Sequence, residues 1–539
     1  MNRIRAIATL ACLLGAISLS RATERPNVII VMVDDMGYSD LGCYGGEIKT
    51  PNLDKLTQGG LRFRRFYNTG KCHSSRVTLL SGLHSYQAGN AGRDGTVKLH
   101  NKDVARGVTI AQVLRRAGYY TAVSGKWHIT PEPKALGFDR SFGFLNGYIG
   151  DYFASRKLLL DGQEYTGRKA YITDLITEYG IEFIEEAKNK KKPFLLYLPY
   201  NAPHYPLQAP PEEIDKYRGT YRQGWLTVRE RRLEKMKKLG LVGKDWVPAA
   251  PDEANLRDWR SLSEEDQDYQ DLLMATYAGM IDRIDQNIGR LVEKLKDLGA
   301  YENTLILFFS DNGAEQATML RARELYERSI PTTQGNSFTT VGADWAFVSN
   351  TPYRLFKTHM HEGGIISPCI AHWPQGMSLP GGTIDHQNVF HLMDIMPTIV
   401  ELCGATYPER FEGRTIESMN GVSMAPAFKG KTAVRDGGIY QMFGQNRAYR
   451  LGDWKVVSKG FSRWELYDMK SDPTEQNNLA AQLPEKVEEL KAMWWKVAKQ
   501  DERLPPNLKK PCLDKPASFK RFLLRQGNQR VPIVDRKSK

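Results

Sequence analysis

The run from Cys72 to Gly82 (CHSSRVTLLSG) is the part of this sequence whose residue types and spacing point most directly to chemistry. Arg76 follows Cys72 by four residues, so both side chains would share one face of a helix. Cys72 would then stand at the helix N-terminus, where exposed N–H groups and the helix dipole favour anions. The pattern suits a nucleophile that acts on an anionic substrate. A buried or disulfide-bonded cysteine is the alternative that this short run leaves open.

Two acidic pairs follow apolar runs elsewhere in the chain. Asp34 and Asp35 come directly after one run, and Asp311 and Asn312 come after another. Either pair alone is commonly a turn or a helix cap. Together they offer four hard oxygen donors, which suit calcium or magnesium better than zinc. Crowded carboxylates also need a cation to offset their repulsion, so the sequence predicts a metal site.

Basic and imidazole side chains complete the set. Lys126 and His128 follow one strand-like run, His204 follows another, and Lys357 precedes a pair of glycines. A lone histidine is usually structural, and a lone lysine is usually solvated. An ester of an oxyanion such as sulfate needs cationic clamps, an activated nucleophile and acid–base groups. With Arg76, these residues supply all three kinds of group.

The elements that must position these residues alternate along the chain. Continuous apolar runs at 27–33, 194–198 and 304–309 are typical of strands buried on both faces of a parallel sheet. Helical patterns lie at about 108–117 and 277–295. We therefore expect an α/β fold with a large mixed, mainly parallel sheet sandwiched by helices. Ligands bind outside the carboxyl ends of such strands, which is where the polar residues fall.

The whole chain divides by composition into four predicted parts. They are a signal peptide at 1–22, a catalytic domain at 23–430 with a charged helical insertion at 213–270, a smaller C-terminal α+β domain at 431–505, and a basic tail at 506–539. The N-terminal segment has a positive start, a short apolar stretch and a small-x-small cleavage site. An uncleaved anchor is the alternative reading of that segment, and no later run reaches the ~18 apolar residues of a membrane span.

Charge and cysteine usage narrow the partners. The chain carries a net charge of +13 and no nucleic-acid-binding motif. An exported basic protein favours anionic small molecules or polyanionic glycans. Outside the signal peptide there are five cysteines, and none forms a CxxC pair. An odd number in an oxidising compartment marks one cysteine for other chemistry. The four that remain permit disulfides without demonstrating any, and we expect a periplasmic or secreted protein.

Taken together, these motifs resemble those of the formylglycine-dependent sulfatases, of the arylsulfatase type in the alkaline phosphatase superfamily. The resemblance covers nearly all of the mature chain. Its motifs are Cys72–Arg76, Pro26–Asp35, Gly125–His128, Lys357–Gly364, Glu465–Asp468 and Asp472–Leu479. Each motif is weak to moderate alone, but their joint order is specific. The resemblance implies an alkaline phosphatase-like fold.

The resemblance also implies two cofactors. Cys72 is oxidised after synthesis to formylglycine (3-oxoalanine) by a maturation enzyme, and one calcium ion binds beside it. The implied calcium ligands are Asp34, Asp35, Cys72, Asp311 and Asn312. A hydroxyl of the hydrated aldehyde attacks sulfur, and the resulting sulfate ester collapses without attack by water. The implied activity is hydrolysis of sulfate monoesters of aryl or carbohydrate alcohols.

The implied catalytic residues have separate roles. His204, assisted by Lys357, protonates the leaving oxygen, and His128 takes a proton from the second hydroxyl. Arg76 and Lys126 hold the aldehyde hydrate and neutralise charge.

One residue departs from the family pattern. Position 74 is serine, where the family has proline or alanine, and this departure puts the installation of formylglycine in question. Two alternatives follow. One is a phosphonate or phosphate monoester hydrolase of the same superfamily, and the other is a non-catalytic sulfoglycan binder in which Cys72 stays a thiol. The segments that would recognise the natural substrate, at 213–270, at 314–350 and in the C-terminal domain, carry no readable code.

Overall fold

A computed structural model describes residues 25–89, 103–154, 157–251, 256–317, 339–460 and 462–500. The predicted signal peptide at 1–22 and the basic tail at 506–539 lie outside the described residues, as do Cys512 and most of the 314–350 segment. No described helix is long and apolar enough to cross a membrane.

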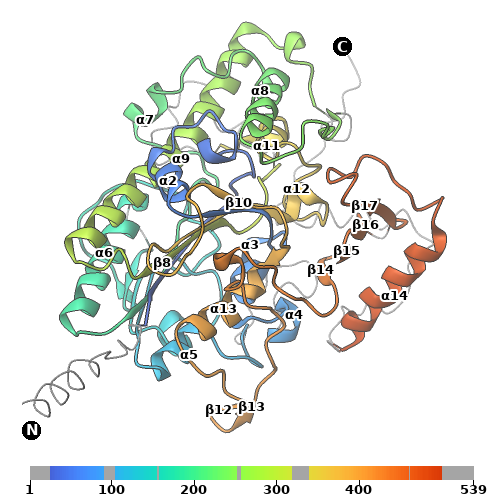
Figure 1. Ribbon diagram of the computed structural model, residues 1–539. Helices are drawn as coiled ribbons and strands as arrows, with labels where there is room; N and C mark the ends of the chain where they lie inside the picture. Colours follow the sequence, from blue (N-terminus) through green and yellow to red (C-terminus); the bar gives the residue numbers. More distant parts are fainter. Residues whose placement is uncertain are drawn as a thin grey trace, which may run out of the picture.

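A large mixed sheet forms the centre of the molecule (Figure 1). Its strands run in the order β10-β2-β9-β8-β1-β7-β3-β4-β5-β6, and β11 pairs with β2. The pairs among β8, β1, β7, β3 and β4 are parallel, whereas β9 runs antiparallel to both of its neighbours. The strands are β1 Asn27–Val33, β2 Leu61–Tyr67, β3 Tyr120–Lys126, β4 Arg140–Phe144, β5 Leu159–Leu160, β6 Gln163–Glu164, β7 Phe194–Pro199, β8 Thr304–Ser310, β9 Ile366–His372, β10 Thr383–Asp385 and β11 Phe390–His391.

Helices cover both faces of this sheet (Figure 1). The α-helices that precede the second sheet in the chain are α2 Pro51–Gln58, α3 Cys72–Ser81, α4 Ser85–Ala88, α5 Ile110–Arg116, α6 Ile172–Asn189, α7 Pro211–Asp215, α8 Trp225–Lys238, α9 Glu264–Asp297, α11 Gly342–Ser349, α12 Glu362–Ile365 and α13 Ile395–Leu402. Successive side chains of a strand point to opposite faces. In β1, Ile29 and Val31 therefore join the core under α6 and α9, while Val28 and Ile30 join the core under α3, α5 and α13. Apolar side chains fill most positions of β1, β7 and β8 because both faces of these strands are buried.

A second, smaller sheet lies beside the first (Figure 1). Its four antiparallel strands are β14 Ile439–Phe443, β15 Asn446–Leu451, β16 Trp454–Ser458 and β17 Glu465–Asp468. The helix α14 (Pro484–Gln500) packs on it through Leu490 and Trp494, which join Val456 and Leu466 in a separate core. A short hairpin, β12 (Arg410–Phe411) and β13 (Arg414–Thr415), precedes this sheet in the chain.

The architecture confirms the predicted fold class, with a mainly parallel sheet between helices and a smaller C-terminal α+β unit. The runs at 27–33, 194–198 and 304–309 are strands, and those at 108–117 and 277–295 lie in helices. The described part of 213–270 is helical, with no strand. The exact domain boundary near 430 stays a prediction.

Candidate active site

The two acidic pairs meet at the carboxyl ends of neighbouring strands. β1 and β8 are parallel, with Val33 opposite Ser310, so the residues that follow them arrive together. The Asp35 N–H donates to Asp311 Oδ1 at 3.3 Å, and Asn312 Nδ2 donates to Asp35 Oδ1 at 2.6 Å. The set is fully buried. Sequence reasoning placed these oxygens at one sheet edge, and the structure brings them into contact.

Arg76 and Lys126 reach the same cluster from different elements. Lys126 ends β3 and forms an ion pair with Asp34. Arg76 Nη2 lies 3.1 Å from Asp311 Oδ2 and 3.9 Å from Asp34 Oδ2. Burial by itself would raise the pKa of Asp34, but Lys126, His204 and Arg76 hold it below its usual range. The two cations therefore keep the Asp34 carboxylate ionised in a dry site.

Lys357 and His204 contact Asp35. Lys357 Nζ lies 2.6 Å from Asp35 Oδ1 and 3.1 Å from Glu315 Oε2. His204 Nε2 lies 3.5 Å from Asp35 Oδ2, and its Nδ1 contacts the Tyr205 carbonyl oxygen at 2.6 Å. A carbonyl oxygen only accepts, so Nδ1 carries a proton there. Nε2 is the ring nitrogen that faces the acidic cluster.

Cys72 is the first residue of α3 and is 2% exposed. Ser75 Oγ donates to the Asp311 carbonyl oxygen at 2.6 Å and ties the first turn of this helix to the end of β8. Arg76 stands one turn after Cys72, as the spacing predicted, and Gly82 ends the helix with φ 68°. Burial lowers the pKa of Lys357, but Asp35, Glu315 and Cys72 together raise it well above its usual value. Cys72 therefore begins a helix whose first turn is held against the end of β8.

His128 occupies a left-handed backbone position (φ 60°) just beyond β3. Burial, with Lys126 and His73, lowers the pKa of His128 well below its usual value, which favours the neutral imidazole. Its ring centroid lies 5.3 Å from that of His73, whose Nε2 contacts Asp103 Oδ2 at 3.0 Å. A Cβ added to Gly147 would lie 2.8 Å from His128 Nε2. A neutral histidine held in this way is suited to accept a proton.

The donor set fits a divalent cation. Asp34 Oδ1, Asp35 Oδ2 and Asn312 Oδ1 are buried and make no hydrogen bond among the described residues. A buried oxygen without a partner costs free energy unless a ligand satisfies it. Burial and the charge of Asp34 raise the pKa of Asp311 to about 8, which shows how closely the carboxylates crowd. Ligand atoms of Asp34, Asp35 and His204 lie within 4.8 Å of one another.

Sequence reasoning missed several residues around the site. Glu315 pairs with Lys357, and although burial raises its pKa, Lys357 and Lys71 lower it to about 2. The only feature of the sequence that could have indicated Glu315 is its position three residues after Asn312. The ring of Tyr148 lies parallel to that of His204, but Tyr148 belongs to no periodic pattern. The contact between His73 and Asp103 joins segments that no local spacing relates.

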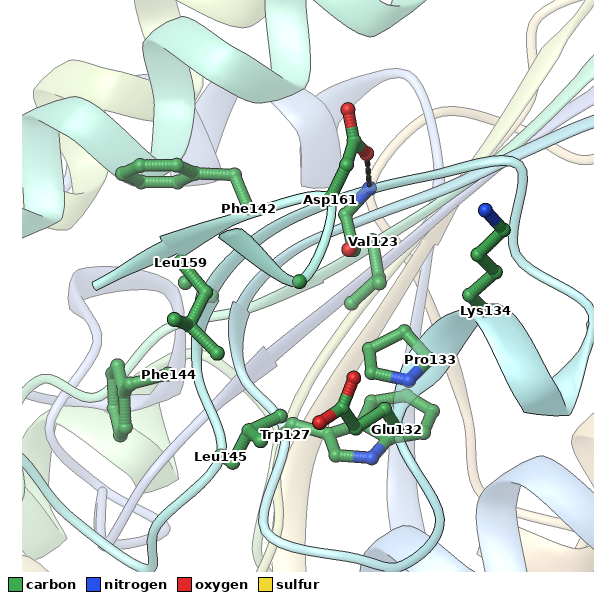
Figure 2. A pocket seen from close by; sticks show the side chains of 14 residues that line it. Val123, Trp127, Glu132, Pro133, Lys134, Phe142, Phe144, Leu145, Leu159 and Asp161 are labelled. Carbon is green, nitrogen blue, oxygen red and sulfur yellow. Dashed lines mark hydrogen bonds between the residues drawn. The ribbon is translucent and has the colours of Figure 1, made fainter. Parts of the chain in front are cut away.

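A separate cavity lies on the other side of β3 (Figure 2). Trp127, Phe142 and Phe144 line it, and the charged residues Glu132, Lys134 and Asp161 lie among its walls. Gly125 and Trp127 face this cavity, while the side chain of Lys126 between them points to Asp34. None of the predicted catalytic residues lines it.

Two family profiles match the chain. The Sulfatase profile covers residues 26–405, and the profile described as N-sulphoglucosamine sulphohydrolase, C-terminal, covers residues 353–502. Together they span both sheets.

Individual relatives agree with these profiles. An uncharacterized sulfatase of Schizosaccharomyces pombe is 34% identical, over 88% of this chain and 93% of its own. An arylsulfatase of Klebsiella aerogenes is 32% identical, over 79% and 97%. The solved structure of Ps i-CgsB in complex with k-i-k-neocarrahexaose superimposes with a TM-score of 0.66 at 25% identity, over 94% and 98% of the two chains. This chain therefore belongs to the sulfatase family, the sulfuric ester hydrolases of the alkaline phosphatase superfamily.

Proposed function

We propose that this sulfatase hydrolyses sulfate monoesters of aryl or carbohydrate alcohols, using formylglycine formed from Cys72 and one calcium ion, and releases inorganic sulfate. The observation that carries the proposal is the set of three oxygens, from Asp34, Asp35 and Asn312, that make no hydrogen bond among the described residues, at the sheet edge to which Ser75 of α3 is bonded. A metal bound there would lie next to residue 72 and to the cations that hold an anion.

The proposed metal ligands are Asp34, Asp35, Asp311, Asn312 and residue 72. All the protein atoms other than that of residue 72 are carboxylate or amide oxygens, which favours calcium over softer metals. When bound, calcium supplies positive charge that stabilises the ionised nucleophile and the charge on sulfate. The aldehyde supplies a hydroxyl nucleophile whose sulfate ester can be released by a proton transfer.

The chain's own cations would bind the sulfate group. Arg76 and Lys126 stand on one side of the acidic cluster and Lys357 on the other, and all three are fully buried. Buried cations act strongly on an anion because little water screens them. They would orient the ester with its sulfur toward residue 72.

Two histidines would move the protons. The Tyr205 carbonyl accepts from His204 Nδ1 and holds the ring with Nε2 facing the site. Because Nδ1 already carries a proton, His204 would act as the doubly protonated imidazolium and give its Nε2 proton to the leaving oxygen, with Lys357 assisting. His128 would take the proton from the hydroxyl group at position 72 as sulfate leaves. Its Nδ1 makes no hydrogen bond within the described ranges.

The relatives indicate the class of alcohol. One is an arylsulfatase of Klebsiella aerogenes, and another is an N-acetylglucosamine-6-O-sulfatase of Bacteroides thetaiotaomicron, 27% identical over 94% of this chain. The Ps i-CgsB structure holds a neocarrahexaose. We infer a sulfated aryl compound or glycan as substrate. We also infer an exported protein, because residues 1–22 read as a signal peptide, matured by a formylglycine-generating enzyme.

Mass spectrometry and sulfate release test the proposal together. The peptide that contains residue 72 should be lighter than the thiol form by about 18 Da. The aldehyde-bearing protein should release sulfate from aryl sulfates or sulfated sugars faster than phosphate from matched phosphates. Cys72→Ala should fold normally and lose turnover, because no other residue can replace the nucleophile. A Cys72→Ala variant with a tenth of the wild-type rate would refute the assignment. An unconverted thiol with tight sulfoglycan binding would instead identify a binder.

A further inference from the structure

Tyr148 is a large apolar side chain at the edge of the buried catalytic cluster. It is 44% exposed, in contrast to the 4% of His204 beside it. The two rings are nearly parallel, with centroids 5.9 Å apart and an angle of 13° between their planes. The ring of Tyr205 lies 5.8 Å from Tyr148 at an angle of 46°. The aromatic side chains therefore form a wall that begins at His204 and ends in solvent.

The loop that carries Tyr148, residues 145–152 after β4, is fixed to the site at several points. The Tyr152 hydroxyl donates to the His204 carbonyl oxygen at 2.8 Å, and the Tyr152 N–H donates to Gln208 Oε1 at 2.8 Å. Gly147 packs so closely on His128 that a Cβ there would lie 2.8 Å from Nε2. Leu145, at the base of the loop, lines the cavity of Figure 2. The position of Tyr148 is therefore set by contacts to both proposed proton-transfer residues.

We propose that Tyr148 stacks against the ring of the departing alcohol and thereby makes the enzyme selective for sulfate esters of ring-bearing alcohols. This inference rests on the proposed function, in which His204 protonates the leaving oxygen. The alcohol must then lie on the His204 side of the sulfate, where Tyr148 is the exposed surface. Aromatic rings offer a flat apolar face to an aryl group or to the C–H face of a sugar. Tyr148 thus acts on specificity and not on the sulfur itself.

The test separates stacking from an effect on the acid. Tyr148→Ala and Tyr148→Phe are assayed, with formylglycine content matched by mass spectrometry, on phenyl sulfate, 2-phenylethyl sulfate, ethyl sulfate and a sulfated monosaccharide. Phenyl and 2-phenylethyl share a ring but differ in the basicity of the leaving oxygen, and ethyl lacks the ring. Tyr148→Ala should lower kcat/KM roughly tenfold on the ring esters, mainly through KM, and less than twofold on ethyl sulfate. Tyr148→Phe should restore most of the loss.

The control is Leu226→Ala on α8, which removes an exposed apolar side chain (46%) outside the site. This variant should leave kcat/KM unchanged on every substrate. Equal losses on all esters, or losses that follow leaving-oxygen basicity, would overturn the inference and assign Tyr148 to support of His204. A loss of kcat/KM confined to the monosaccharide or to the two phenyl esters would support the inference. It would also show whether Tyr148 stacks on a sugar ring or on an aryl ring. Wild-type protein that releases no sulfate from any ester would remove the proposed function and the inference with it, whereas turnover without a Tyr148 effect removes the inference alone.

Discussion

Two of the buried charged clusters among the described residues differ in whether their oxygens have partners. In the active site, Asp34, Asp35 and Asn312 each leave one oxygen without a hydrogen bond. In the second cluster, which we call the C-terminal charge cluster, Lys455 of β16 joins Glu475 to Glu362 of α12.

Each carboxylate oxygen of the C-terminal charge cluster faces a hydrogen-bond donor or a cation, although Glu475 Oε1 makes no hydrogen bond and is held by its ion pair alone. Lys455 Nζ lies 2.6 Å from Glu362 Oε1 and 2.7 Å from Glu475 Oε1. The Tyr67 hydroxyl donates to Glu362 Oε2 at 2.7 Å, and the Glu362 N–H donates to Glu475 Oε2 at 2.8 Å. This cluster fastens the segment after Lys357 to the C-terminal sheet. From this comparison we expect open oxygens that gather at one sheet edge to bind a ligand, and buried charges that pair with one another to form a structural joint.

The largest effect on activity should come from removing a ligand of the proposed metal site. Asp311→Asn should lower kcat/KM by more than about 100-fold, because a proposed ligand and a partner of Arg76 are both lost. It should also abolish stabilisation by calcium, which at 100 times Kd is about 2.7 kcal/mol for the wild type. Melting temperatures with and without calcium measure this.

The metal-free form provides a second readout. Burial and the charge of Asp34 raise the pKa of Asp311, so its ionised form is unfavourable there without a cation. Without calcium, Asp311→Asn should therefore be no less stable than the wild type. Glu475→Gln, in the other cluster, should keep the full calcium shift. If Asp311→Asn retained the calcium shift, the open oxygens would not be a metal site.

The next effect concerns the structural joint. Lys455→Met leaves Glu362 and Glu475 buried without their shared cation, which should cost about 3–5 kcal/mol of unfolding free energy. Urea denaturation measures this loss, and kcat of the folded fraction should change far less than in Asp311→Asn. Lys486→Met breaks the exposed pair with Glu489 and should cost less than about 1 kcal/mol. Equal losses in the two variants would show that the buried pairs carry no special weight.

Whether these clusters could be predicted from the sequence depends on where their residues lie along the chain. Asp34 and Asp311 were predictable because each ends an apolar strand, and parallel strands end at one sheet edge. The joint was not, because Glu362 and Glu475 are 113 residues apart and only the folded chain relates them. Both residues fall in motifs that supported the family resemblance. The spacing of residues within each motif, however, did not predict that the two motifs contact each other.

The same limit applies to the sheet and to the loops. β2 (Leu61–Tyr67) carries three arginines and shows neither a continuous apolar run nor strict alternation, so it was not predicted as a strand. Its neighbours β9 and β10 come from sequence 300 residues later. Tyr148 lies in a loop whose course is set by tertiary contacts to His204 and His128. Local periodicity describes elements, and long-range contacts select their neighbours.

A smaller effect should appear in the pH dependence of stability. Burial and the charge of Glu362 raise the pKa of Glu475 from 4.5 to about 7, against the pull of Lys455. Between these pH values the folded protein binds a proton that the unfolded chain has lost. Unfolding free energy should therefore fall as pH rises from 5 to 7, by about 1 kcal/mol or more from this group. Glu475→Gln should flatten that slope, whereas the exposed Glu489→Gln should not. A slope unchanged in Glu475→Gln would contradict the raised pKa.

The smallest effect on the folded protein should come from replacing Ser74. This residue lies near Cys72, but its hydroxyl has hydrogen-bond partners, as most oxygens of the C-terminal charge cluster do. Its hydroxyl donates to the Lys71 carbonyl oxygen at 3.0 Å and lies 2.7 Å from Thr69 Oγ1. The hydrogen-bond ladder of α3 begins with the Ser75 N–H, which donates to the Lys71 carbonyl at 2.9 Å. Proline at position 74 would therefore remove no helical hydrogen bond, and proline is tolerated in the first turn.

We predict that Ser74→Pro changes unfolding free energy by no more than about 1 kcal/mol, the net value of a neutral hydrogen bond. Because the family pattern has proline or alanine at this place, the fraction of formylglycine at residue 72 should rise when the variant is produced with a formylglycine-generating enzyme. Mass spectrometry of that peptide, with melting temperature alongside, measures both effects. Ser75→Pro is the matched control, since it removes the first helical N–H and the hydroxyl bound to the Asp311 carbonyl at 2.6 Å. It should destabilise the protein strongly. If Ser74→Pro left the aldehyde fraction unchanged, recognition by the maturation enzyme would not depend on position 74, and Ser74 would matter only through its two local hydrogen bonds.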